Sequence, residues 1–139
     1  MRSLKSTFFL AAIALFACAT PHRDYPVSLI ATVDDMAELM DVQATVSEPR
    51  FDLAESLAGA SELTEQDWAA FHDMGTRLVA TSARAEHLSP GEIFSRWNGV
   101  LGAQAASLVE AATFRDIEQT LLLVTEIDET CEACHDVTR

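Results

Sequence analysis

The chain has few of the residues that interrupt helices. Its 139 residues include five glycines and four prolines, while alanine is abundant and runs of β-branched residues are short. This composition favours an all-helical protein, because alanine is the best helix former and glycine and proline are the poorest. Without the N-terminal export signal described below, about 120 residues remain, which fits a single domain.

Basic residues are also scarce. The chain has 22 acidic and 9 basic residues, Lys5 is its only lysine, and its net charge is −13. Removal of residues 1–17 takes away two basic residues and no acidic ones, which leaves 7 basic and 22 acidic residues and a net charge of −15. Such a charge should repel nucleic acid and anionic lipid and attract basic protein partners, although solubility in a salty medium explains it equally well.

Cysteine is rare too, but two of the three cysteines stand in a motif. Cys131-Glu132-Ala133-Cys134-His135 has the spacing of covalent haem attachment. On a helix the two thiols and the imidazole share one face, so one segment supplies both thioethers and the proximal iron ligand. A redox dithiol would need a βαβ pattern and a zinc site a second cysteine pair; the sequence has neither. It therefore predicts one haem c, bound through Cys131 and Cys134, with His135 on the iron.

The N-terminus has the features of an export signal. Arg2 and Lys5 precede an apolar run over 8–17 that is too short to span a membrane. Cys18 follows directly, as in a lipoprotein signal, although Phe16 is bulky for that motif and ordinary cleavage after an Ala-x-Ala pattern is the alternative. We favour lipidation, because it explains the third cysteine. The prediction is a signal peptide over 1–17, a tether over 18–27, and a periplasmic lipoprotein held at a membrane surface.

The remaining sequence predicts four helices. They run over about 28–47, 65–86, 90–112 and from 114 into the haem motif, with Thr64, Ser89 and Thr113 as the N-caps of the last three. Short loops between helices of roughly 20 residues indicate an antiparallel four-helix bundle over 28–139. The haem motif then lies near the C-terminus of the fourth helix.

These features resemble the class II c-type cytochromes, the cytochrome c-prime family. The tail Cys131-x-x-Cys134-His135-Asp136-x-x-Arg139 is similar to the usual ending of that family. The resemblance implies an all-α bundle, covalent haem, and a place for Arg139 near the proximal His135. The resemblance also allows a homodimer, which members of the family often form through the first two helices.

The resemblance further implies that the first helix faces the open side of the haem. Met36-Ala37-Glu38-Leu39-Met40 looks like the element that supplies a sixth iron ligand in some members of the family, with Met40 preferred and Met36 second. The alternative is that both side chains fill gaps in the core, as methionine commonly does. The family often has an arginine in this helix for a haem propionate. The helix over 28–47 has no arginine, so Arg50, Arg77 or Arg96 would have to substitute.

We therefore expect an exported one-electron carrier that docks with redox proteins and is not an enzyme. A five-coordinate module that binds nitric oxide or carbon monoxide is the main alternative, and a haem-free structural lipoprotein is a third. Other residues that could bind haem are expected to lie elsewhere: the His72 and Met74 side chains on the second helix, the solvated His22 and His87, and the packing aromatics Trp68 and Trp97. For Trp97 a place against the haem edge is the alternative.

Overall fold

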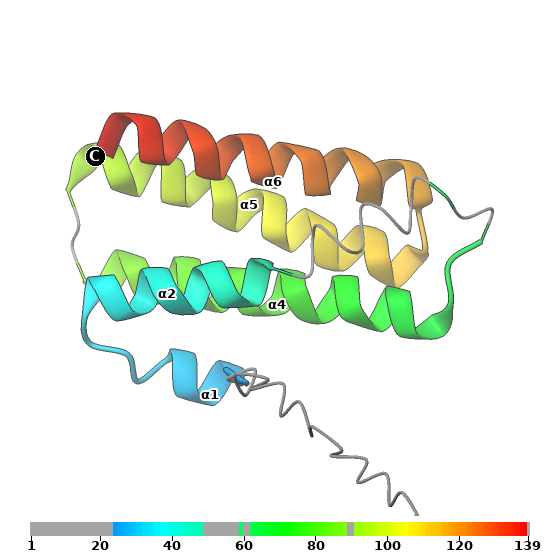
Figure 1. The fold of residues 1–139 in the computed structure, drawn as a ribbon, viewed down its shortest axis with the longest axis horizontal. Coiled ribbons are helices and arrows are strands. Elements are labelled where there is room, and N and C mark those ends of the chain that lie inside the picture. Colours follow the sequence, from blue (N-terminus) through cyan, green and yellow to red (C-terminus); the bar gives the residue numbers. More distant parts are fainter. Residues whose placement is uncertain (1–23, 49–58, 60–61, 89–90, 139) are drawn as a thin grey trace, which may run out of the picture.

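The computed structural model of the protein describes residues 24–48, 59, 62–88 and 91–138 (Figure 1). In these ranges four long helices form an antiparallel bundle, which confirms the predicted fold class. They are α2 (Met36–Ser47), α4 (Glu65–His87), α5 (Glu92–Phe114) and α6 (Ile117–Thr138). A single turn, α1 (Val27–Ile30), precedes them and packs on α4.

The first helix is shorter than predicted. Instead of one helix over 28–47, the chain forms α1, leaves helical conformation, and begins again at Met36. The break follows from the Asp35 side chain, which accepts a hydrogen bond from the Glu38 amide at 2.9 Å and so caps a new helix. Val33, between the two helices, is buried and holds the connection against the bundle.

The α4 N-terminus is as predicted. Thr64 accepts a hydrogen bond from the Asp67 amide, and the Asp67 carboxylate accepts one from the Thr64 amide, which completes a capping box. This network also lowers the pKa of Asp67, mainly through the Thr64 hydroxyl and then the Thr64 amide. Asp67 is therefore ionised at neutral pH, as the positive end of the helix dipole favours.

The other two helices begin elsewhere than predicted. Helix α5 begins at Glu92, after Gly91 at a positive φ of 100°, and Ser89, the predicted cap, lies outside the described residues. Thr113 lies inside α5, where its hydroxyl donates to the Val109 carbonyl. Helix α6 is instead capped by Asp116, whose carboxylate accepts from the Gln119 amide at 3.0 Å. A threonine inside a helix can satisfy its hydroxyl on the preceding turn, so its presence does not mark a helix start.

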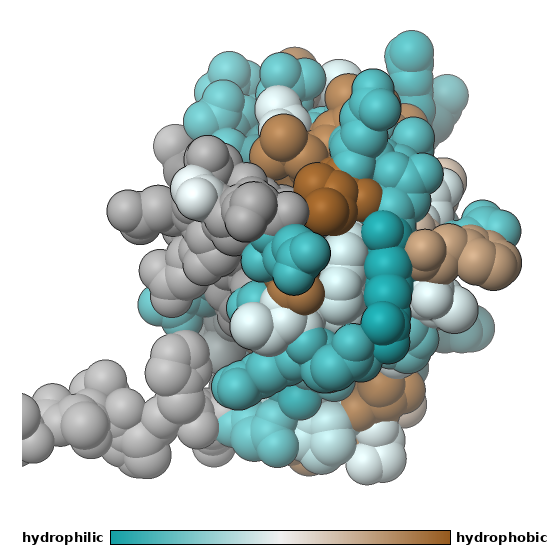
Figure 2. Space-filling view, turned by 90° about the vertical axis from the view of Figure 1, so that its right-hand side faces the viewer, coloured by the Kyte–Doolittle hydropathy of each residue, from teal (hydrophilic) through white to brown (hydrophobic). Residues whose placement is uncertain are grey.

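The core runs along the centre of the bundle. Each long helix buries residues three or four apart, as an amphipathic helix in a bundle does. The largest fully buried side chains include one or more from every long helix: Leu39, Val42, Phe71, Met74, Leu78, Leu108 and Ile127. Figure 2 shows the end of the bundle where α4 and α6 begin; it is mostly hydrophilic, with hydrophobic residues in small patches. None of the helices in the described ranges combines the length and hydropathy that crossing a bilayer requires.

Candidate functional site

A cavity lies at the other end of the bundle. It has a volume of about 750 Å³ and is bounded by α2, the first half of α5 and the last turns of α6. Because α6 runs antiparallel to α2, its C-terminal turns lie at the same end as the α2 N-terminus (Figure 1). The topology thus brings the end of the chain beside residues about a hundred positions earlier.

The haem motif lines this cavity. Helix α6 buries Thr120, Val124, Ile127 and Thr130, and at the same spacing the next residues along the helix are Cys131 and Cys134. Both cysteines are half-buried and His135 is exposed, and all three contribute to the cavity wall. The sequence places them on the helix face that packs inward, so their position follows from the same periodicity that builds the core.

Two methionines line the cavity from α2. Met36 and Met40 are both half-buried, while Leu39 and Val42 on the neighbouring face are fully buried and hold α2 on the bundle. A second cavity of about 350 Å³ adjoins the first, and Met40, Cys131 and His135 line both. Met36 lines only the larger of the two cavities. Of the two thioethers, Met40 therefore shares more of its surroundings with the haem motif.

The remaining wall is largely apolar. Phe94, Trp97 and Leu101 line the cavity from α5. Two other apolar residues on its wall are left open, Ile93 with 60% and Val137 with 53% of the side-chain surface exposed. Large aliphatic side chains at such exposure are common singly, but here both face one cavity, which an apolar group would fill.

One polar wall residue has an unused acceptor. The Asn98 side chain is buried, and its amide donates to the Ser82 carbonyl at 2.9 Å and to the Glu86 carboxylate at 2.6 Å. Its Oδ1 is buried and accepts no hydrogen bond within the described part of the chain. A buried acceptor of this kind normally has a partner, so this position on the wall suits a donor from water or from a bound group.

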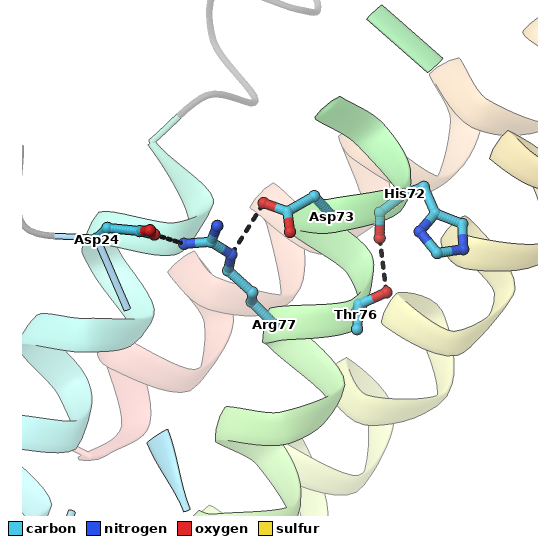
Figure 3. Close-up of polar contacts among 5 residues, drawn as sticks. All are labelled: Asp24, His72, Asp73, Thr76 and Arg77. Atoms are coloured by element: carbon cyan, nitrogen blue, oxygen red, sulfur yellow. Dashed lines mark hydrogen bonds and ion pairs between the residues drawn. The ribbon is translucent and has the colours of Figure 1, made fainter. Parts of the chain in front are cut away.

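The other candidates lie away from the cavity. His72 is exposed on α4 (Figure 3), Met74 is buried in the core, and His87 is exposed at the end of α4. Trp68 packs on Phe71 with ring centroids 6.3 Å apart. Cys18, His22, Arg50 and Arg139 lie outside the described residues.

The two described arginines suggested for a propionate do not line the cavity. Arg77 is paired with Asp24 and Asp73, and Arg96 is exposed on α5. Neither belongs to the cavity wall. Arg50, the third of the suggested arginines, lies outside the described residues.

Sequence reasoning missed part of the wall. Gln43 lines both cavities and donates from Nε2 to the Thr81 hydroxyl at 3.2 Å, which links α2 to α4. Its position, three residues after Met40 and seven after Met36, was a usable signal, because these spacings share a helix face. Trp97 was interpreted first as a packing aromatic and second as a residue at the haem edge, and it lies in the cavity wall. No sequence spacing indicated that α5 faces the haem motif.

The comparison with known families agrees with this geometry. A model of the family described as Cytochrome C' matches residues 30–139. The chain belongs to the cytochrome c' family. Searches among curated proteins and among solved structures found no match. Members of this family carry covalently bound haem c, act in electron transfer or gas binding, and are typically periplasmic.

The residues of the site fit a haem c. Two thiols at the attachment spacing, an imidazole and two thioethers line one cavity, and these are the ligand types that haem proteins use. The volume of about 750 Å³ lies within the range of small-molecule and cofactor sites, and the wall is mostly apolar with few polar groups. Cys131 and Cys134 would form the thioethers and His135 would bind the iron.

Proposed function

We propose that this member of the cytochrome c' family is a one-electron carrier with a filled sixth iron site. The observation that carries the proposal is that Met40 lines the same two cavities as Cys131 and His135, from the facing helix. A methionine thioether as the axial ligand raises the potential of a His-ligated haem and leaves little room for a gas ligand. Met36, one turn earlier on the same face, is the second choice.

The chain's own residues would supply binding, orientation and shielding. When bound, haem c supplies an iron that accepts and releases a single electron. Cys131 and Cys134 hold the group covalently, and His135 sets the proximal side. Phe94, Trp97 and Leu101 keep water from much of the macrocycle, which favours the less charged ferrous state. No bond-making chemistry is required of the protein, so we propose a carrier and not an enzyme.

We further propose that the protein is exported to the periplasm and anchored by a lipid on Cys18. The N-terminal charge pattern, the short apolar run and the cysteine directly after it support this. With a net charge of −15 after removal of residues 1–17, we expect redox partners with basic surfaces.

The Met40→Leu variant tests the electron-carrier proposal. Met and Leu have similar volumes, so the fold should survive with a cost below about 1.5 kcal/mol. We expect the wild-type holoprotein to have a sharp low-spin reduced absorption spectrum that carbon monoxide does not change. The variant should turn high-spin and bind carbon monoxide.

Met36→Leu is the matched control and should keep the wild-type spectrum. If Met36→Leu alone becomes high-spin, the ligand is Met36. A wild-type spectrum that is already broad and shifts with carbon monoxide would replace the carrier with the gas-binding function. A colourless, stably helical protein from a host with haem-maturation machinery would refute both and favour a structural lipoprotein.

A further inference from the structure

The segment before α2 is fastened to α4. Three of its side chains are buried: Tyr25, Ile30 and Val33. Arg77 on α4 donates from Nη1 to the Asp24 carboxylate at 2.6 Å and lies 2.8 Å from the Asp73 carboxylate (Figure 3). Further along, the Arg84 Nε donates to the Val33 carbonyl. Both ends of the segment are therefore held on the same helix.

The ion pairs with Asp24 and Asp73 favour the charged form of Arg77. Burial lowers the pKa of Arg77, but its hydrogen bonds with Asp24 and Asp73 outweigh burial and raise the pKa overall. A singly paired surface arginine would add little, but two carboxylates from different elements restrain the guanidinium from both sides. Asp24 consequently has a defined place beside the middle of α4.

The attachment of this segment to α4 leaves a small apolar and basic surface exposed, here called the α1–α4 face. On α1, Val27 and Leu29 each keep 45% of their surface exposed. Next to them lies a groove of about 360 Å³ between α1 and α4. The groove is lined by four apolar and two basic residues and by no acidic one: Val27, Ala31, Ala80, Ala83, Arg84 and His87.

The charge of the bundle is distributed unequally around this face. Helix α6 contains six acidic residues and no lysine or arginine, and the same holds for residues 34–48, with five acidic residues. Helix α4 carries Arg77 and Arg84 but also four acidic residues, Glu65, Asp67, Asp73 and Glu86, so it is less acidic than α6 and residues 34–48 without being basic. An anionic membrane surface repels carboxylates and attracts arginine, so what such a surface tolerates on this side of the bundle is the groove, which has Arg84, His87 and no acidic residue.

We propose that the α1–α4 face rests on an anionic phospholipid surface, with the lipid phosphates beside Arg84 and His87. The inference rests on the proposed lipid anchor at Cys18. Only six residue steps separate Cys18 from Asp24, which gives a reach of at most about 20 Å for an extended chain. Because Asp24 is held beside α4, the anchor keeps that side of the bundle close to the lipid.

This orientation determines where the haem cavity opens. In Figure 1, α1 and α6 lie on opposite sides of the bundle. With the α1–α4 face on the membrane, α6 and its haem motif are directed away from the lipid. The carrier would then exchange electrons with soluble partners while it remains anchored, instead of with a membrane-embedded partner beneath it.

Two spin-label positions test the orientation in the lipidated holoprotein. A nitroxide is attached to Leu29→Cys, on the proposed face, and to Leu122→Cys, whose native residue is 50% exposed on α6. Each protein is bound to vesicles of phosphatidylethanolamine and phosphatidylglycerol. Collisions with lipid-soluble oxygen should rise and collisions with a water-soluble nickel complex should fall at position 29, with no change at position 122. The same change at both positions, or a change at 122 alone, would overturn the proposal.

Charge variants test the role of Arg84. A basic residue near an anionic surface contributes about 1 kcal/mol to binding. In Arg84→Gln, the ratio of molecules whose label at position 29 contacts lipid to molecules whose label does not should therefore fall about fivefold. Arg84→Lys keeps the charge and should retain the contact. Loss of contact in both variants would mean that Arg84 acts only by holding Val33, and would overturn the role assigned to its charge.

Two further outcomes separate this inference from its premises. Wild-type protein that has a normal haem spectrum but does not float with vesicles would refute the anchor and the orientation together, and leave the electron-carrier proposal intact. Cys18→Ser should not float. Dipolar broadening between labels at position 29 without vesicles would show that a second copy of the chain covers this face, and would overturn its assignment to lipid.

Discussion

Two helix pairs of this bundle are built in opposite ways. Along the α4–α5 pair, small residues let the backbones approach: a side-chain carbon added at Gly75 would lie 2.9 Å from Val109 Cγ2, and one at Gly102 would lie 2.6 Å from Ser82 Oγ. Between α2 and α6 there is instead a cavity of about 750 Å³. Protein interiors are normally packed as densely as organic crystals, so a gap of this size indicates room for another molecule.

The two helix pairs differ in the size of the side chains between them. The α4–α5 pair is closed by glycine, alanine and two hydrogen bonds between Ser82 and Asn98. The cavity is lined by methionine, phenylalanine and tryptophan, which would each contact a large flat group. The closed pair thus stabilises the protein by itself, whereas the open side is complete only with a cofactor.

The largest expected effect comes from removing the covalent attachment on the open side. Cys131→Ser combined with Cys134→Ser should abolish covalent haem completely, because both thioethers are lost. Haem staining after a denaturing gel, in which only covalently bound haem remains with the chain, measures this. Thr138→Ala, at the same cavity wall, is the control and should keep its haem. Staining that survives in the double variant would refute the attachment site.

On the closed side, Phe71→Ala should cost about 3–5 kcal/mol of unfolding free energy, because it removes a fully buried ring. Chemical denaturation followed by circular dichroism measures the loss. The haem spectrum of the folded fraction should stay unchanged, since Phe71 does not line the cavity. Phe94→Ala is the matched variant on the cavity wall and should shift the haem spectrum. Equal spectral changes in both variants would contradict the division into a closed and an open side.

Two glycine substitutions sharpen the comparison at smaller cost. Gly75→Ala should destabilise the protein by about 1–3 kcal/mol, because the new carbon meets Val109 and the Ala105 carbonyl across the helix pair. Gly99→Ala, on the same bundle but with nothing within 4 Å of the added carbon, should stabilise it by about 0.5–1 kcal/mol. Thermal unfolding measures both. A stabilising Gly75→Ala would show that α4 and α5 are not in close contact.

The smallest effect concerns pH at the α4 N-terminus. The pKa of Asp67 is lowered in the folded state, so its contribution to stability is present above its ordinary value of 3.8 and is lost as the pH falls through the lower, folded value. In Asp67→Asn, the free energy of unfolding should therefore depend less on pH below 3.8 than in the wild type. The haem spectrum should change little. Identical acid limbs in the variant and the wild type would remove Asp67 from this role.

Periodicity and the haem motif were sufficient to predict the architecture and one wall of the site. The spacing of Ile127, Cys131 and Cys134 is a property of a single helix, so it can be derived from local sequence. The break before Met36 could not, because Asp35 competes with a continuous helix and the buried Val33 decides the outcome. Gln43 and Trp97 were missed as wall residues because their role depends on how α2 and α5 face α6.

The helices that pack most extensively are consecutive in the chain: α4 on α5 and α5 on α6. Contacts between neighbours along the sequence close short loops, and proteins rich in such contacts fold quickly. We therefore expect the unit formed by α4, α5 and α6 to assemble quickly. Helix α2 joins it through α4 on one side and faces the cavity on the other, so this helix is the part of the bundle whose folding is coupled to occupancy of the cavity.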